Sequence, residues 1–192
     1  MSKNVLFISD QALIDRTQIH GNIDPKLLYP EIKVAQDMYI LPLLGTALFN
    51  KIQNDILNNT LSGDYLALKD DYILDTLVYY VLSELPEGLS FQFWNKGVLR
   101  QGSDNTEAPT MTELVRISDR FKRRAEWYAE RLKRYLIENY ATKFPEYANP
   151  GNGADTIHPN VKAFTLPIYL GDSGRKKDCG GGSREYITNC DI

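Results

Sequence analysis

The stretch from Thr110 to Tyr140 constrains the fold of this chain more than any other part of the sequence. It reads TMTELVRISDRFKRRAEWYAERLKRYLIENY. Thr110, followed three positions later by Glu113, fits a capping box at the start of a helix. Apolar residues then recur every three or four positions, as on the buried face of an amphipathic helix. At 1.5 Å per residue the helix would be about 45 Å long, so we expect its far end to project or to pack on a neighbouring subunit.

Three further helices are predicted before this one, and Pro, Gly and Asn residues mark their ends. The third is apolar nearly all round in its second half, so we expect it to be the central and most buried helix. Its pattern is interrupted near residues 69–71, and Pro86, Glu87 and Gly88 should stop it. The predicted ranges are 30–41, 45–57 and 62–85.

A β-hairpin is predicted over residues 89–100. Aromatic and polar residues alternate through Trp94, and Asn95, Lys96 and Gly97 supply a turn. Two strands alone are only marginally stable in water. The hairpin should therefore pack on its own helices or find a partner on another molecule, and the aromatic residues fit both readings.

The two ends of the chain lack the pattern of long regular elements. Residues 1–29 are broken by Gly21 and Pro25, which favours an arm or a short strand. Residues 141–192 are rich in Pro and Gly, yet contain apolar residues that suggest a segment ordered only when docked. We therefore predict a mostly α fold, a helical bundle with a small β-hairpin and a long irregular C-terminal extension. The predicted regions are an N-terminal arm (1–29), a helical domain (30–140) and an extended arm (141–192).

Charge is distributed unevenly along the chain. The formal net charge is −3, but residues 1–110 carry −6 and residues 111–140 carry +3. Such asymmetry suits nucleic-acid contact, and equally suits subunits that pair head to tail. Acidic residues among the basic ones of the long helix permit pairs such as Glu130 with Arg134, which favours a paired or interfacial face. The aromatic residues Trp127, Tyr128 and Tyr135 are interpreted as core.

No arrangement of residues predicts an enzyme. His20 and His158 lie in expected loops, and Cys179 and Cys190 lie in the last fourteen residues. The acidic residues of 70–75 read as a solvated helix face, and the glycines near the C-terminus lack the strand and helix of a phosphate loop. We therefore predict no catalytic residue, no cofactor and no metal. No run of about 18 apolar residues indicates a membrane span, and the first residues lack the features of a signal peptide, so a cytosolic protein is expected.

Three segments carry a resemblance to a known family. They are IKVAQDMYILPLLGTALFNKIQNDI (32–56), DDYILDTLVYYVLSELPEGLSFQFWNKGVLRQGSDN (70–105) and RFKRRAEWYAERLKRYL (120–136). Together they resemble the head-to-tail connector proteins of tailed phages that infect Bacteroidetes, including crAss-like phages. The resemblance spans residues 30–140. It implies a mostly helical subunit of a ring, typically twelvefold, that lies beneath the portal and joins the capsid to the tail.

This resemblance sets the expected partners and place of action. The partners would be copies of the same chain, the portal protein and other neck or tail proteins, with DNA only passing through the channel and no membrane involved. The protein would lie in the virion neck, after assembly in the host cytoplasm. The alternative is a helical nucleic-acid-binding regulator that uses the basic helix 111–140. Candidate subunit-interface residues are Phe91, Phe93, Trp94, Lys96, Arg120, Arg124 and Arg131, and candidate arm-docking residues are Phe164, Leu166, Ile168 and Tyr169.

Overall fold

The long helix predicted from the sequence is present as α7, Met111–Asn139. Its capping box is formed in both directions, since the hydroxyl of Thr110 accepts from the Glu113 N–H at 3.3 Å and the Glu113 carboxylate accepts from the Thr110 N–H at 2.8 Å. The computed structural model describes residues 5–94, 97–100 and 109–160. The chain divides into two units, Met1–Val161 and Lys162–Ile192, and the description below concerns the first.

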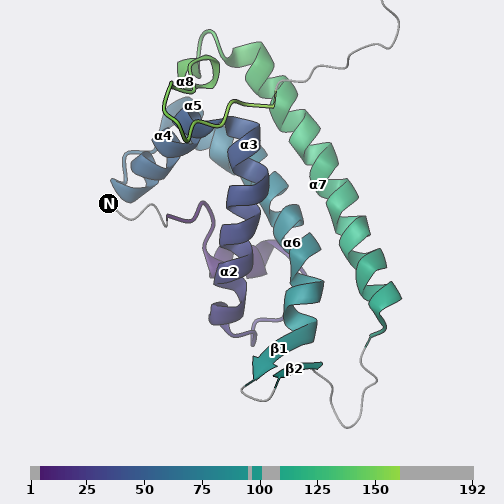
Figure 1. The fold of residues 1–192 in the computed structure, drawn as a ribbon. Coiled ribbons are helices and arrows are strands. Elements are labelled where there is room, and N and C mark those ends of the chain that lie inside the picture. Colours follow the sequence, from purple (N-terminus) through teal and green to yellow (C-terminus); the bar gives the residue numbers. More distant parts are fainter. Residues whose placement is uncertain (1–4, 95–96, 101–108, 161–192) are drawn as a thin grey trace, which may run out of the picture. The chain divides into compact units, whose positions relative to one another are not determined.

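The described part of the chain is mostly α-helical, which confirms the predicted class (Figure 1). Two five-residue turns, η1 and η2, are π-helical and join α-helices end to end. In chain order the elements are α1 (Asp10–Arg16), α2 (Pro25–Ala35), η1 (Gln36–Ile40), α3 (Leu41–Leu44), α4 (Thr46–Leu57), α5 (Gly63–Leu68), η2 (Lys69–Ile73), α6 (Leu74–Ser90), β1 (Phe91–Trp94), β2 (Gly97–Arg100), α7 (Met111–Asn139) and α8 (Pro145–Ala148).

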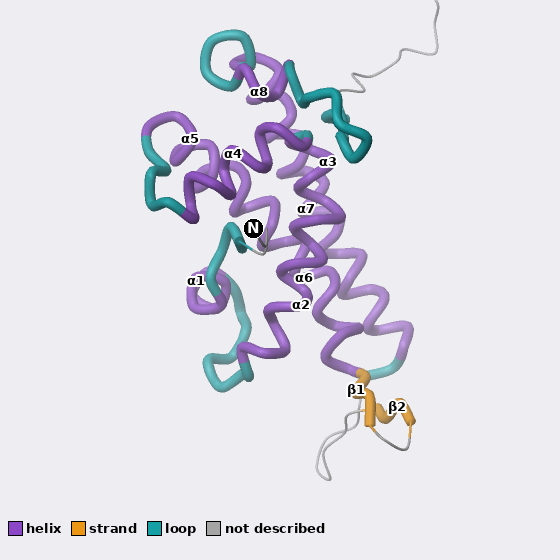
Figure 2. The backbone as a smooth tube through the Cα atoms, turned by 60° about the vertical axis from the view of Figure 1, so that its left-hand side comes forward, coloured by secondary structure: helices purple, strands orange, loops and turns teal. Residues whose placement is uncertain are grey.

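Helix α6 lies at the centre of the unit, between α2 and α7 (Figures 1 and 2). Leu77 and Val81 of α6 have no exposed surface, as expected for the most buried helix. The interruption predicted near residues 69–71 is the π-helical turn η2, which carries the helical chain from α5 into α6 without a break. The unit therefore packs the hydrophobic helix α6 between the amphipathic helices α2 and α7.

The prediction that Pro86 stops this helix is wrong, because α6 continues to Ser90. A proline inside a helix removes one backbone hydrogen bond and crowds the preceding turn. Here Leu85 is buried and Leu89 packs against the core, so continuing the helix keeps both side chains out of water. The Ser90 hydroxyl donates to the Pro86 carbonyl and closes the last turn. Tertiary packing thus outweighs the local signal.

The N-terminal residues belong to the same packed unit. Helix α1 occurs where the sequence predicted an arm or a short strand, and α2 begins at Pro25 rather than at Pro30, with the Asp24 carboxylate accepting from the Lys26 N–H at 2.9 Å. Phe7 is 4% exposed and lies in the hydrophobic core. Burial of such N-terminal side chains against α2 and α4 explains why this region folds with the rest.

The helical unit also extends beyond Tyr140, where the prediction ended it. Phe144 has no exposed surface and its ring meets that of Tyr65 edge-on, with centroids 5.4 Å apart. Further along, the Thr46 N–H donates to the Ile157 carbonyl at 3.0 Å, and the Asn160 N–H donates to the Pro42 carbonyl at 3.0 Å. These contacts hold the chain against the junction of α3 and α4 as far as Asn160.

Strands β1 and β2 form an antiparallel pair with Phe91 opposite Arg100 and Trp94 opposite Gly97. Of the side chains in these strands the structure describes that of Phe91, which is half-buried. Among the residues that are placed, no helix combines the length and the apolar character that crossing a membrane would require.

Candidate functional site

Residues 36–45, QDMYILPLLG, lie within the first of the three segments that carry the family resemblance and have a structural role. Gln36, buried at the start of η1, accepts from the Phe7 N–H at 2.8 Å and donates to the Val5 carbonyl at 2.9 Å. Tyr39 stacks on Tyr80 with ring centroids 4.1 Å apart and donates to the Glu84 carboxylate at 2.6 Å. Residues 36–45 therefore hold the N-terminal segment and α6 in place.

Two pairs of tyrosine rings join α7 to η2 and α6, which continue one another along the chain. Tyr72 stacks on Tyr135 with centroids 4.1 Å apart, and Tyr79 stacks on Tyr128 with centroids 5.2 Å apart. The members of each pair lie seven residues from those of the other pair on both helices, which is two helical turns. The stacked rings therefore fix the register of α7 at two points.

Two arginines of α7 lie over these rings. The guanidinium of Arg131 lies 4.6 Å from the centre of the Tyr72 ring. That of Arg124 lies 5.9 Å from the ring centres of both Tyr79 and Phe121. An arginine over an exposed aromatic ring is stabilised by about 0.5–1 kcal/mol, so the rings hold both guanidinium groups near the surface of the unit.

Trp127 lies between these arginines in the sequence and is 63% exposed. Its ring meets the Tyr128 ring edge-on at 4.9 Å, and the rest of the indole faces solvent. The interpretation of Trp127 as core is therefore wrong, whereas Tyr128 and Tyr135 do pack on α6. The signal was available in the sequence, because Trp127 falls on the arginine spacing of the helix and off its apolar spacing.

Five residues at alternating steps of four and three share this side of α7. We call them the arginine edge: Arg120, Arg124, Trp127, Arg131 and Arg134. All five are exposed. None of its arginines forms an ion pair with a described residue, since Lys133 is the basic residue of α7 that does so.

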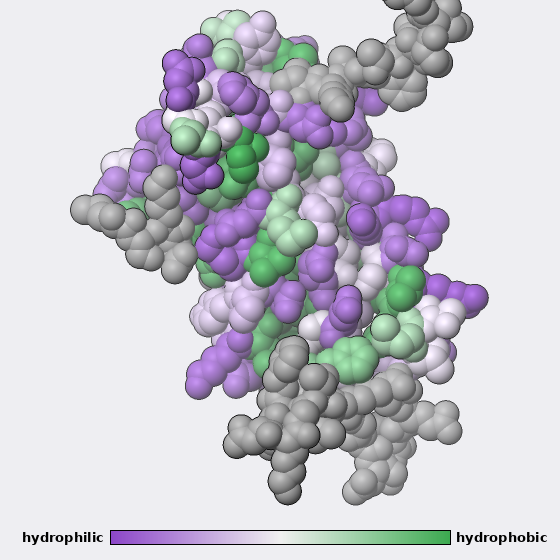
Figure 3. Space-filling view, viewed as in Figure 1, coloured by the Kyte–Doolittle hydropathy of each residue, from purple (hydrophilic) through white to green (hydrophobic). Residues whose placement is uncertain are grey.

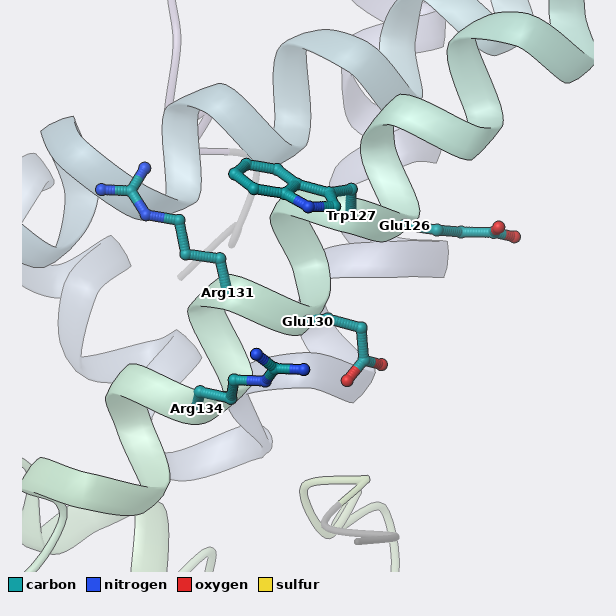
Figure 4. A pocket seen from close by; sticks show the side chains of 5 residues that line it. All are labelled: Glu126, Trp127, Glu130, Arg131 and Arg134. Atoms are coloured by element: carbon teal, nitrogen blue, oxygen red, sulfur yellow. The ribbon is translucent and has the colours of Figure 1, made fainter. Parts of the chain in front are cut away.

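A hollow of about 410 Å³ lies along the middle of α7. Figure 4 shows Trp127 and Arg131 on one side of the helix, with Glu126 and Glu130 pointing to the other side. Arg134 completes its lining. The hollow thus combines an exposed indole with two guanidinium groups, and its carboxylates stand at the far rim.

The opposite side of α7 carries Glu126 and Glu130, which lie near Tyr80. Glu130 pairs with Lys133 rather than with Arg134, the pair that the sequence permitted. Burial raises the pKa of Tyr80 to about 12, and the charges of Glu126 and Glu130 add to that increase. A second hollow, of about 220 Å³, runs from this side of α7 to Met38 in η1. The carboxylates of the middle of α7 therefore lie away from the side that carries Arg124, Trp127 and Arg131.

The arginine edge has the composition typical of protein interfaces. Trp, Tyr and Arg are the residues most enriched where binding energy concentrates.

The acidic residues of 70–75 take part in surface ion pairs. Asp70 pairs with Lys69 at 2.9 Å and Asp75 pairs with Arg16 at 3.6 Å. Within the described ranges, no group of three or more His, Cys, Asp or Glu is arranged to hold a metal ion.

The structure brings part of the predicted interface together. Arg120, Arg124 and Arg131 lie on the arginine edge, and Phe91 is half-buried at the end of α6. The other predicted residues fall outside what the structure describes, either entirely or for their side chains. These are Phe93, Trp94, Lys96, Phe164, Leu166, Ile168, Tyr169, Cys179 and Cys190.

A known protein family matches the chain. A family model described as a family of unknown function, DUF6712, matches residues 40–157, which is more than half of the chain. The matched range runs from η1 to Ile157 and contains the whole arginine edge. No curated protein and no solved structure matches the chain.

Proposed function

We propose that this chain, which belongs to the DUF6712 family of unknown function, is a structural subunit that assembles with copies of itself into a ring. The resemblance to phage head-to-tail connectors makes the ring a part of the virion neck, with about twelve copies between the portal and the tail. DNA passes through its channel, and the subunit has no catalytic role. The partners are other copies, the portal protein and other neck or tail proteins.

The observation that carries this proposal is the exposed Trp127 at the centre of the arginine edge, 63% exposed in the single chain. An indole is a large apolar surface to leave in water, and a partner that covers it stabilises the complex by up to a few kcal/mol. Because Arg124 and Arg131 already rest on tyrosine rings, little side-chain freedom is lost when a partner binds. The side chains of the arginine edge are therefore already ordered before a protein partner binds.

Two further segments would add contacts in the assembly. We propose that the hairpin of residues 89–100 presents its aromatic residues, Phe91, Phe93 or Trp94, to a neighbouring subunit. We also propose that residues 141–192 include an arm whose apolar residues dock on adjacent neck or portal components. Replacing Trp94 by Ala should yield a folded subunit that joins rings poorly, whereas loss of the thermal transition would place this side chain in the subunit's own core.

Assembly can be tested directly on the full chain. Sedimentation velocity over a wide range of concentrations should show a large, discrete oligomer, and electron microscopy should show rings, alone or after mixing with the portal protein. Trp127→Ala should lower the oligomer fraction while the helical circular dichroism spectrum stays unchanged. A control, Met111→Ala, removes another exposed apolar residue of α7 and should assemble normally. A chain that stays monomeric at every concentration and with the portal protein present would contradict the proposal.

Binding of nucleic acid is the second candidate function, because the arginines of the edge have no ion-pair partner among the described residues. Each neutralised phosphate releases counterions, so a regulator that uses α7 would bind DNA with a steep dependence on salt. Fluorescence anisotropy with a labelled duplex distinguishes the two functions. A ring subunit should show weak binding, whereas tight binding by a monomer, with loss of several decades of affinity from about 50 to 200 mM salt, would favour the regulator.

A further inference from the structure

A second exposed surface lies on α2 and η1. Leu27, Val34 and Met38 are 40%, 40% and 59% exposed, and with Glu31 they follow one another at steps of four, three and four residues. We call these four residues the α2 ridge. Figure 3 shows hydrophobic residues, in green, among hydrophilic ones over α2. Such an apolar row on a helix that already buries Leu28 and Ile32 on its inner face has no partner in the described part of the chain.

The α2 ridge carries one acidic residue, Glu31, and two more, Glu84 and Glu87, lie beside it. Glu31 lies so close to Gly88 of α6 that a β-carbon added there would come within 2.5 Å of its carboxylate oxygen. Partial burial raises the pKa of Glu31, and the charges of Glu84 and Glu87 raise it further. None of these three carboxylates forms an ion pair with a described cation. The ridge therefore combines an apolar row with uncompensated negative charge.

The arginine edge has the complementary pattern. It places guanidinium groups around an apolar indole at the same alternating steps of four and three. Rows with this spacing are those that interlock when two helices pack at a small angle. The two surfaces cannot satisfy each other within one chain, because the edge adjoins Tyr72 of η2 and Tyr79 of α6 whereas the ridge adjoins Glu84 and Gly88 of α6.

Resting on the ring assembly proposed above, we infer that the α2 ridge of each copy receives the arginine edge of the next copy. Trp127 of one copy packs on Val34 and Met38 of its neighbour, and the arginines around it face the carboxylates that border the ridge. This contact joins two different surfaces, so an open row of copies keeps one free surface of each kind, at its two ends, until the assembly closes. A ring built this way leaves neither surface exposed.

A charge swap tests the pairing. Arg120 and Glu87 are exposed, and neither side chain makes a hydrogen bond or an ion pair with the rest of the described chain. The single variants Arg120→Glu and Glu87→Arg each place like charges opposite each other and should weaken self-association about tenfold or more. In a mixture of the two variants, alternating copies restore opposite charges at every contact, so assembly should return. The double variant should also assemble, for the same reason.

Matched controls reverse charges elsewhere on the unit. Lys122→Glu changes an exposed cation on the other side of α7, and Asp71→Arg changes an exposed acid on η2. Both should assemble like the unmodified chain. All variants are compared by sedimentation velocity after circular dichroism has shown equal helix content.

The outcomes separate this inference from the proposed function. If the unmodified chain does not assemble, the proposed function fails. If it assembles and the single swaps have no effect, the ring stands and the ridge is not its contact surface. If the single swaps weaken assembly but neither the mixture nor the double variant restores it, the two surfaces do not face each other and the inference is overturned.

Discussion

Replacement of Gly45 by Ala offers a quantitative test of the junction between α3 and α4. Gly45 has φ of +76° and ψ of 159°, a backbone conformation that is almost exclusive to glycine. A β-carbon there would lie 2.8 Å from Cγ and Cδ of Pro159 and 3.3 Å from the Ile157 carbonyl oxygen. The substitution therefore strains the backbone and also pushes residues 157–160 away from the junction.

The expected loss can be built from these two effects. Backbone strain of this kind costs about 1–3 kcal/mol, and alanine recovers about 0.4–1 kcal/mol by restricting the unfolded chain. Displacing the segment breaks the hydrogen bonds from Thr46 to Ile157, from Ile157 to the Thr46 hydroxyl and from Asn160 to Pro42, at about 1 kcal/mol each. We expect Gly45→Ala to lower the free energy of unfolding by about 3–6 kcal/mol.

Urea denaturation followed by circular dichroism measures this loss in unfolding free energy. A substitution at a second glycine isolates the contribution of backbone strain. Gly63 has φ of +59° but nothing within 4 Å of an added β-carbon, so Gly63→Ala should cost only about 1 kcal/mol. Combining Gly45→Ala with Pro159→Ala removes the ring atoms that clash and should recover part of the loss. If Gly45→Ala costs no more than Gly63→Ala, the packing of residues 157–160 does not contribute and the reasoning is wrong.

Three further predictions concern groups with defined partners. Gln36→Leu should lower the free energy of unfolding by about 1–3 kcal/mol in urea, because it leaves the buried Phe7 N–H without its acceptor. An unchanged urea midpoint would contradict this prediction and would mean that a water molecule accepts from the Phe7 N–H in place of the Gln36 side chain. Thr110→Ala should cost about 1 kcal/mol through loss of the α7 cap, measured by the same denaturation and refuted by no change. Burial, followed by the hydrogen bond to Glu84, raises the pKa of Tyr39 to about 12. The contribution of Tyr39 to stability is therefore complete below about pH 10 and is lost as the pH rises to about 12. Tyr39→Phe should make the free energy of unfolding fall less steeply between these pH values. An identical slope in the variant would exclude Tyr39 as the source of this fall.

The sequence predicted the elements whose signals are local and repeated. The capping box at Thr110 and the apolar spacing after it defined α7 at both ends, because each depends on residues within one or two turns. The central position of α6 followed from its apolar composition. Sequence reasoning failed where distant residues decide the outcome. Pro86 stays helical because Leu85 and Leu89 have a core to enter, which no local pattern reveals.

The candidate site was predicted only in part, for a similar reason. Arg124 and Arg131 drew attention as basic residues, but their positions over Tyr79 and Tyr72 depend on how α6 and α7 are aligned. Trp127 was assigned to the core because aromatic residues usually lie there. Its place among the arginines on the helical spacing indicated the opposite. The α2 ridge was missed because its row continues from α2 into the π-helical turn, beyond the range of a regular helical pattern.

The two tyrosine stacks between α6 and α7 have a mechanical consequence. Sliding one helix along the other by a single turn would separate both ring pairs at once, together with the arginines that cover them. A force applied along α7 is therefore transmitted to α6, because the two helices are fixed to each other at two positions and move as one rigid body.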